Sequence, residues 1–337
     1  MLLLLAACAE PTEPFVLLTG WNYEWEQLSH RVSTLRVGVA DDTSLSLGLV
    51  GGDWSTGATF TDTPYYRVRY QRVTATGLRV FRGTATLLVG PEPSGTTTLE
   101  LDAAGLPEGY ALSAVINGFS LDTNVPQGPD YPADYDPAYG YTSNGFGFFL
   151  GDVERVGDTL RVPVQANVRW GPQDRADMNA AIPYAVTEVT VDVVVLAGPF
   201  EPETWSASKT LDLPWDPPFT DQPPLELDVD FAGGASEALI AWRGFDLGLN
   251  LEGPSMGEGD YLRAFGAELI PVSVQDRAFN ASITATISTS SLSEWSDPFA
   301  GFEGALVRFG APDLHAEHWT VAGSHPTGLA TTGPTAE

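Results

Sequence analysis

The chain has 337 residues, of which 44 are acidic and 16 are basic, and its net charge is −28 at pH 7. This charge excludes nucleic acid as a partner, because phosphate binding needs a basic surface. With 43% hydrophobic and 11% aromatic residues, the composition is that of a folded protein and not of a disordered one. The chain is long enough to bury a sizeable core, and its single cysteine excludes an intramolecular disulfide.

The first ten residues, MLLLLAACAE, combine a short apolar run with that cysteine. The run is shorter than the roughly 20 apolar residues of a transmembrane helix, and Pro11 follows too soon for a core helix. Leu5-Ala6-Ala7-Cys8 resembles the lipobox of bacterial lipoprotein signal peptides. The resemblance implies cleavage before Cys8 and a diacylglyceryl group on its thiol. Because Ala9 and not aspartate follows, it also implies the outer membrane. The alternative is a free thiol in a Leu/Ala-rich start.

The rest of the chain resembles no domain family, but its hydrophobic pattern has a period of two, which predicts an all-β fold. Apolar and polar residues alternate in four clear segments, namely 65–73, 159–170, 186–197 and 281–289. Glycine, proline and aspartate clusters separate the segments. The best helix candidate, 174–182, is one or two turns long.

An internal repeat indicates two domains. Residues 96–124 line up with 222–250, so that Leu99-Glu100-Leu101-Asp102 matches Leu225-Glu226-Leu227-Asp228, and Gly118-Phe119 matches Gly244-Phe245. We therefore expect tandem antiparallel β-sandwiches, with one large β-sandwich as the alternative. The expected parts are a signal-peptide remnant (1–7), a lipidated tether (8–19), two β-sandwich domains (20–198 and 199–323) and a flexible tail (324–337).

Two patterns have a structural and a functional interpretation. In the repeated Leu-Glu-Leu-Asp, leucines in a strand would face the core and the acids would face water; the functional alternative is a pair of catalytic carboxylates. The segment 21–27, WNYEWEQ, places two tryptophans and a tyrosine close together. These aromatic residues are expected to pack in the core, and the alternative is a binding platform.

The most unusual stretch is 123–145, a predicted loop that is long for a compact domain. Its carboxylates could hold Ca²⁺, and its aromatic rings could stack on a sugar or pack against a protein partner. A solvated loop whose tyrosines pack on the body is the structural alternative. The candidate metal ligands are Asp130, Asp134 and Asp136, and the candidate ligand-binding residues are Tyr131, Tyr135, Tyr139 and Tyr141.

Three histidines, His315, His318 and His325, lie close together near the C-terminus. The following sequence is strand-like, and residues three apart in a strand lie on opposite faces, which argues against a shared metal site. The sequence also contains no nucleophile elbow, P-loop or Rossmann glycine pattern.

The leading hypothesis is therefore a non-enzymatic, lipid-anchored protein of the cell envelope with a structural or ligand-binding role. Its partners would be the membrane, through the lipid, and a glycan or an envelope protein. Ca²⁺ is the one cofactor under consideration. Alternatives are a calcium-stabilised adhesion module and an extracellular hydrolase that uses the loop aspartates Asp130, Asp134 and Asp136.

Overall fold

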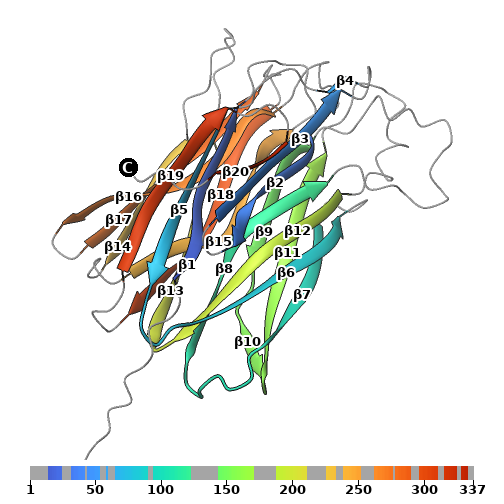
Figure 1. The fold of residues 1–337 in the computed structure, drawn as a ribbon. Helices are drawn as coiled ribbons and strands as arrows, with labels where there is room; N and C mark the ends of the chain where they lie inside the picture. The colour runs from blue at the N-terminus through green and yellow to red at the C-terminus, as the bar shows by residue number, and fades with distance from the viewer. Residues whose placement is uncertain are drawn as a thin grey trace, which may run out of the picture.

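The protein is all-β in the residues that its computed structural model describes (Figure 1). These residues are 14–24, 32–41, 44–53, 58–59, 65–89, 94–122, 143–170, 187–210, 225–232, 238–251, 262–275, 278–289, 296–309, 315–324 and 328–332. Every strand pair among them is antiparallel, and this part of the chain contains no helix. The predicted all-β class is confirmed.

The strands follow one another closely along the chain. They are β1 (Phe15–Glu24), β2 (Val32–Asp41), β3 (Ser44–Asp53), β4 (Ala58–Thr59), β5 (Tyr65–Thr74), β6 (Arg79–Val89), β7 (Ser94–Asp102), β8 (Ala111–Asp122), β9 (Ser143–Leu150), β10 (Glu154–Val156), β11 (Thr159–Trp170), β12 (Thr187–Gly198), β13 (Phe200–Thr210), β14 (Leu225–Ala232), β15 (Ala238–Leu251), β16 (Leu262–Gln275), β17 (Ala278–Thr289), β18 (Ser296–Phe309), β19 (His315–Ser324) and β20 (Gly328–Thr332). The four segments predicted from alternation coincide with β5, β11, β12 and β17. The candidate helix 174–182 lies outside the described residues.

The strands form three sheets. The first has the order β14-β17-β16-β1-β5-β19 and the second β10-β11-β9-β15-β18-β13, with β7 also paired to β11. The third has the order β20-β3-β2-β8-β12-β6, with β4 paired to β3.

Apart from the short strands β10 and β4, each sheet is the union of two triplets of strands. The A triplets are β6-β12-β8, β13-β18-β15 and β19-β5-β1, and the B triplets are β7-β11-β9, β14-β17-β16 and β20-β3-β2. Along the chain, β6 to β12 form one A and one B triplet, which we call repeat 1. Strands β13 to β18 visit the same places in the same order, as repeat 2. Together the three sheets therefore have a threefold pseudo-repeat.

Both ends of the chain are needed for the third unit, repeat 3. Strands β19 and β20 take the places that β6 and β7 take in repeat 1, and β1, β2, β3 and β5 supply the rest. The red β19 accordingly lies beside the blue β5 (Figure 1). Repeat 3 is thus completed by pairing the C-terminal strands β19 and β20 with the N-terminal strands β5 and β3.

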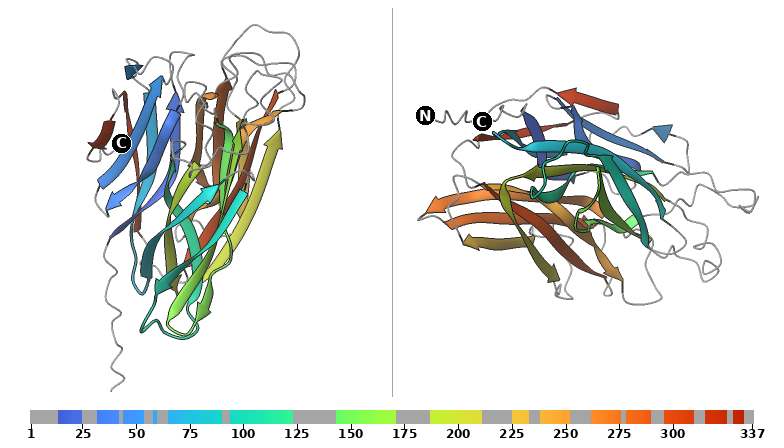
Figure 2. Two further views of the ribbon diagram at one scale, coloured as in Figure 1. Left: turned by 90° about the vertical axis from the view of Figure 1, so that its right-hand side faces the viewer. Right: turned by 90° about the horizontal axis from the view of Figure 1, so that it is seen from below.

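Tandem independent sandwiches are not confirmed by this topology. Every sheet contains strands from both sides of Gly198, and the pairs β1–β16, β9–β15 and β2–β8 join one repeat to the next. The aligned stretches 96–124 and 222–250 contain β7–β8 and β14–β15, which have equivalent places in repeats 1 and 2. Viewed nearly end-on, the blue strands, the teal-to-green strands and the yellow-to-orange strands occupy different sides of the molecule (Figure 2, right).

The joining strands β1, β8 and β15 share a local irregularity. Each has a β-bulge, recorded as a register shift against β5, β12 and β18 respectively. Each bulge is followed by glycine and then an aromatic residue. The three tripeptides are Thr19-Gly20-Trp21, Asn117-Gly118-Phe119 and Arg243-Gly244-Phe245. A bulge bends its strand and increases the local twist, which suits a strand that connects two triplets.

The three aromatic residues meet at the centre of the molecule. Trp21 lies 5.1 Å from Phe119 and 4.4 Å from Phe245, and Phe119 lies 5.4 Å from Phe245, measured between ring centroids. All three are buried, and each comes from a different sheet. The cluster therefore ties the three sheets together, and the core interpretation of Trp21 is confirmed.

The strand directions give the molecule two different ends. Short connections at 75–78, 103–110 and 151–158, the last of which contains β10, mark one end, which we call the turn end, and β1 begins there (Figure 1, lower end). Phe15 shares a buried cluster with Ala75 and Leu78 of the first of these turns. At the opposite end, the far end, strands are separated by longer intervals, including 123–142, 171–186 and 211–224.

Candidate functional site

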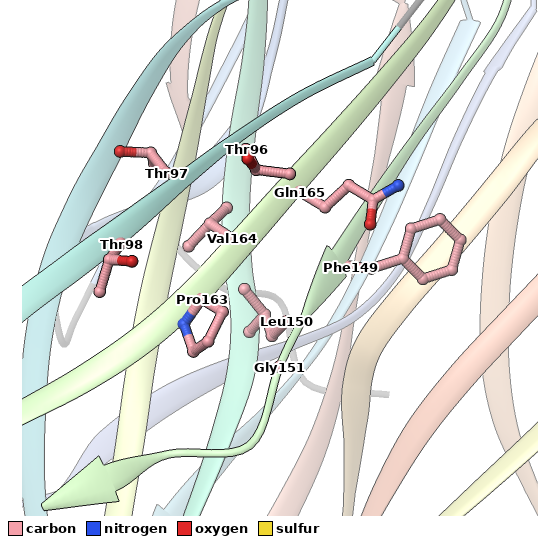
Figure 3. A pocket seen from close by; sticks show the side chains of 9 residues that line it. All are labelled: Thr96, Thr97, Thr98, Phe149, Leu150, Gly151, Pro163, Val164 and Gln165. Carbon is pink, nitrogen blue, oxygen red and sulfur yellow. The ribbon is translucent and has the colours of Figure 1, made fainter.

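A hollow of about 460 Å³ lies on the outer face of the B triplet of repeat 1 (Figure 3). We call it the β11 hollow, because β11 crosses its middle. It is lined by Thr96, Thr97, Thr98, Phe149, Leu150, Gly151, Pro163, Val164 and Gln165. These residues come from β7, from β11 and from the end of β9.

Strict alternation in β11 determines which of its side chains reach this face. Leu160, Val162 and Val164 are buried, whereas Pro163 and Gln165 between and beyond them are exposed. The register with β7 places Pro163 opposite Thr98 and Gln165 opposite Thr96. On its other side Gln165 is opposite Phe149. Polar and apolar outer-face positions from three strands therefore meet in one place.

The hollow lies at the gap between the end of β9 at Leu150 and the start of β10 at Glu154. The ladder on this side of β11 stops at Leu150 and resumes at Glu154, and Pro163 faces the gap. Its carbonyl accepts a hydrogen bond of 2.8 Å from the Gly151 N–H. A proline is tolerated inside a strand only where the ladder does not require its missing N–H, as at this interruption.

Two glycines shape the site. A Cβ on Gly151 would lie 2.9 Å from the Pro163 ring, so a larger residue here would press against the hollow. A Cβ on Gly244 of β15 would lie 2.5 Å from Phe149 Cδ1, because the phenyl ring packs directly over this glycine. The absence of side chains at 151 and 244 therefore leaves room for the two rings that line the hollow.

None of the lining residues that the structure describes has an ionisable side chain. Gln165 Nε2 donates a hydrogen bond of 3.1 Å to Asn167 Oδ1, which orients its amide group. The Gln165 side chain extends towards Phe149, and Thr98 stands beside Pro163 (Figure 3). The next cross-strand pair on this face is the ion pair between Arg161 Nε and Glu100 Oε1, 2.9 Å apart. An uncharged hollow thus lies on the surface of a strongly acidic protein.

The residues predicted to form sites are mostly outside the described part. Cys8, the candidate calcium ligands Asp130, Asp134 and Asp136, and the tyrosines Tyr131, Tyr135, Tyr139 and Tyr141 all lie outside it. Their roles stay predictions. The β11 hollow was not predicted, and Pro163 was the available signal, since a proline in the middle of an alternating strand marks a ladder interruption.

The repeated acidic motif has a structural role where side chains are described. In β7, Leu101 is buried and Leu99 half-buried, whereas Glu100 and Asp102 are exposed. Glu100 pairs with Arg161, and Asp102 Oδ1 accepts a hydrogen bond of 3.0 Å from the Ala104 N–H in the following turn. The solvated interpretation of this motif is confirmed for the first copy.

The histidine pair His315 and His318 belongs to one strand, β19, at positions of opposite faces. Within the described ranges, no group of three or more histidine, cysteine, aspartate or glutamate residues is placed to hold a metal. In the same ranges no helix has the length and hydropathy to span a membrane.

One tyrosine in the interior has a perturbed acidity. Desolvation by burial raises the pKa of Tyr70 in β5 above the ordinary value of a tyrosine, because a buried phenolate would lose its hydration. Tyr70 lies in the first sheet and does not line the hollow.

Comparison of the chain with models of protein families, with curated proteins and with solved structures finds no match to any of them.

Proposed function

We propose that the protein is a non-enzymatic, lipid-anchored component of the cell envelope that presents a rigid β-body for ligand binding. The observation that carries this proposal is the polarity of the body. Its first strand begins at the turn end, and the longer intervals between strands are all at the far end.

An anchor on Cys8 would hold the turn end near the membrane. Cys8 precedes Phe15 by seven positions, which span at most about 25 Å when fully extended. The far end, with the interval 123–142 and its tyrosines and aspartates, would then face away from the lipid. This arrangement suits a protein that meets a glycan or another envelope protein.

The closed ring of repeats supports a display role. Pairing between repeats and the buried aromatic cluster oppose movement of one sheet relative to another. Such a body can carry binding groups on its faces and at its far end without rearranging, which lowers the entropic cost of binding. The net charge of −28 would keep it away from anionic headgroups, so that attachment depends on the lipid.

The test is lipid labelling in a bacterial host. Cells that express the chain are fed a clickable fatty acid, and we expect the label on the wild type and not on Cys8→Ser. Membrane fractionation should follow the label. An unlabelled wild type, or a labelled Cys8→Ser variant, would contradict the anchor. Protease added to outer-membrane vesicles of defined orientation should cut at the far end before the turn end.

A further inference from the structure

We infer that the β11 hollow binds a neutral saccharide. This inference rests on the proposed ligand-binding function and names the chemical class of one ligand and its site. The hollow is about 460 Å³, within the range of about 300–1,000 Å³ that is usual for small-molecule sites.

The first argument is the mixture of groups around the hollow. Phe149 and Pro163 offer two rings, and a sugar ring has faces of C–H groups that pack well on such surfaces. Thr96 and Thr98 each supply a hydroxyl that both donates and accepts, and Gln165 supplies an amide. Alternating C–H faces and hydroxyls are the chemical pattern of a saccharide.

The second argument is charge. None of the described lining side chains ionises, while the chain as a whole carries a charge of −28. Anionic sugars would be repelled by the protein's field and would find no cation in the hollow. Two described arginines lie close to the lining residues, and both are already paired: Arg161 with Glu100, and Arg243, which bonds the Leu150 carbonyl, with Asp152. The site therefore favours an uncharged ligand.

The third argument is that three lining groups are already held in place. Gly244 supports the Phe149 ring, Asn167 binds the Gln165 amide, and the Gly151 N–H is bonded to the Pro163 carbonyl. Side chains that are fixed before binding lose little entropy when a ligand arrives. A hollow of this kind can bind a sugar with few contacts.

The experiment is a titration of the full chain with neutral oligosaccharides built from glucose, galactose, mannose and N-acetylglucosamine, followed by calorimetry. We expect at least one to bind, and Gln165→Ala and Thr98→Ala to weaken it about tenfold each, the usual effect of one lost hydrogen bond. Phe149→Leu should weaken it more. The matched control is Thr86→Ala, the same change at an exposed strand position of the third sheet, which should leave the affinity unchanged.

Three results would overturn the inference: no binding of any neutral oligosaccharide at millimolar concentration, binding of acidic oligosaccharides alone, or equal affinity in all four variants. Thermal unfolding of each variant shows whether it remains folded, and Thr98→Ala, at an exposed position, should remain so. Lipid labelling is measured on the same proteins. If the wild type is labelled but binds no neutral sugar, this inference is rejected and the anchor stands. If the wild type binds sugar but is not labelled, the anchor is rejected and this inference stands.

Discussion

Asn117 and Arg243 occupy the same place in repeats 1 and 2, but their side chains form hydrogen bonds to different parts of the fold. Asn117 is buried, and its Oδ1 accepts a hydrogen bond of 2.8 Å from the Leu18 N–H of β1. Arg243 is half-buried, and its Nε donates to the Leu150 carbonyl at 3.0 Å while Nη2 pairs with Asp152. The Asn117 hydrogen bond joins two sheets in the interior, whereas the Arg243 side chain holds the end of β9 against β15 within one sheet.

The two repeats share the backbone bend and the aromatic residue at this place, but they differ in the bulged side chain. The bulge, the glycine and the aromatic residue that follow are common to both strands, because the central packing needs the same bend in each. The bulged side chain has no such constraint, and it is matched to its surroundings. In repeat 3 the same place holds Thr19, which is also buried.

The largest expected effect concerns repeat 3, the one repeat assembled from both chain ends. A chain that stops at Phe309 lacks β19 and β20, so β5 and β3 each lose a paired neighbour. We expect the loss to exceed about 5 kcal/mol, which is comparable with the whole stability of a typical domain, and the shortened chain should not unfold cooperatively.

Circular dichroism during heating measures the cooperativity of unfolding. Adding a separate peptide of residues 310–337 should restore the cooperative transition of the shortened chain. The control is a chain that stops at Thr332, after the last described strand, and it should melt like the full chain. A cooperative transition at the full chain's midpoint without β19 and β20 would show that the fold does not need a complete repeat 3.

Gly244→Ala is expected to have the next largest effect. The new methyl would meet both Phe149 Cδ1 at 2.5 Å and the Phe148 carbonyl oxygen at 3.0 Å, and the backbone cannot move away easily. We expect about 3 kcal/mol of destabilisation, near the upper end for overpacking. Denaturant unfolding measures it. The variant Gly244→Ala/Phe149→Ala should recover part of the loss, and no recovery would show that the ring is not the obstacle.

Asn117→Ala tests the interior side of the comparison. It leaves the Leu18 N–H buried without an acceptor, and we expect a loss of about 2 kcal/mol. Hydrogen exchange should show the Leu18 amide losing protection more than its neighbours. A change below about 0.5 kcal/mol in chemical unfolding would mean that Asn117 does not join the sheets.

Local structure could be predicted from the sequence better than the arrangement of strands could. The alternation of Leu160, Val162 and Val164 with polar residues predicts β11 closely, because a half-buried strand imposes a period of two. The pairing of β9 with β15, or of β3 with β20, cannot be predicted in this way, since it depends on contacts between residues far apart in the chain.

The candidate site was harder still to predict. The β11 hollow depends on a ladder interruption, for which Pro163 is the local signal, and on the contact between Gly244 and Phe149, which follows from the pairing of strands far apart in the chain. By contrast, Gly118-Phe119 and Gly244-Phe245 do stand out in the repeat, because the central packing requires both residues of each pair.

Arg243→Ala should have the smallest effect of the four, although it removes two hydrogen bonds. Asp152 is 94% exposed, so this ion pair is screened by water and is worth less than about 1 kcal/mol. The bond to the Leu150 carbonyl is better shielded, and we expect about 1 kcal/mol in total. Asp152→Asn is the matched control and should cost less than about 0.5 kcal/mol. If Arg243→Ala proves as costly as Asn117→Ala, or Asp152→Asn as costly as Arg243→Ala, the contrast between an interior and a peripheral connection is wrong.

The same two variants also bear on ligand binding. Since the Leu150 carbonyl borders the β11 hollow, Arg243→Ala should lower the affinity for a ligand bound there, while Asp152→Asn should not.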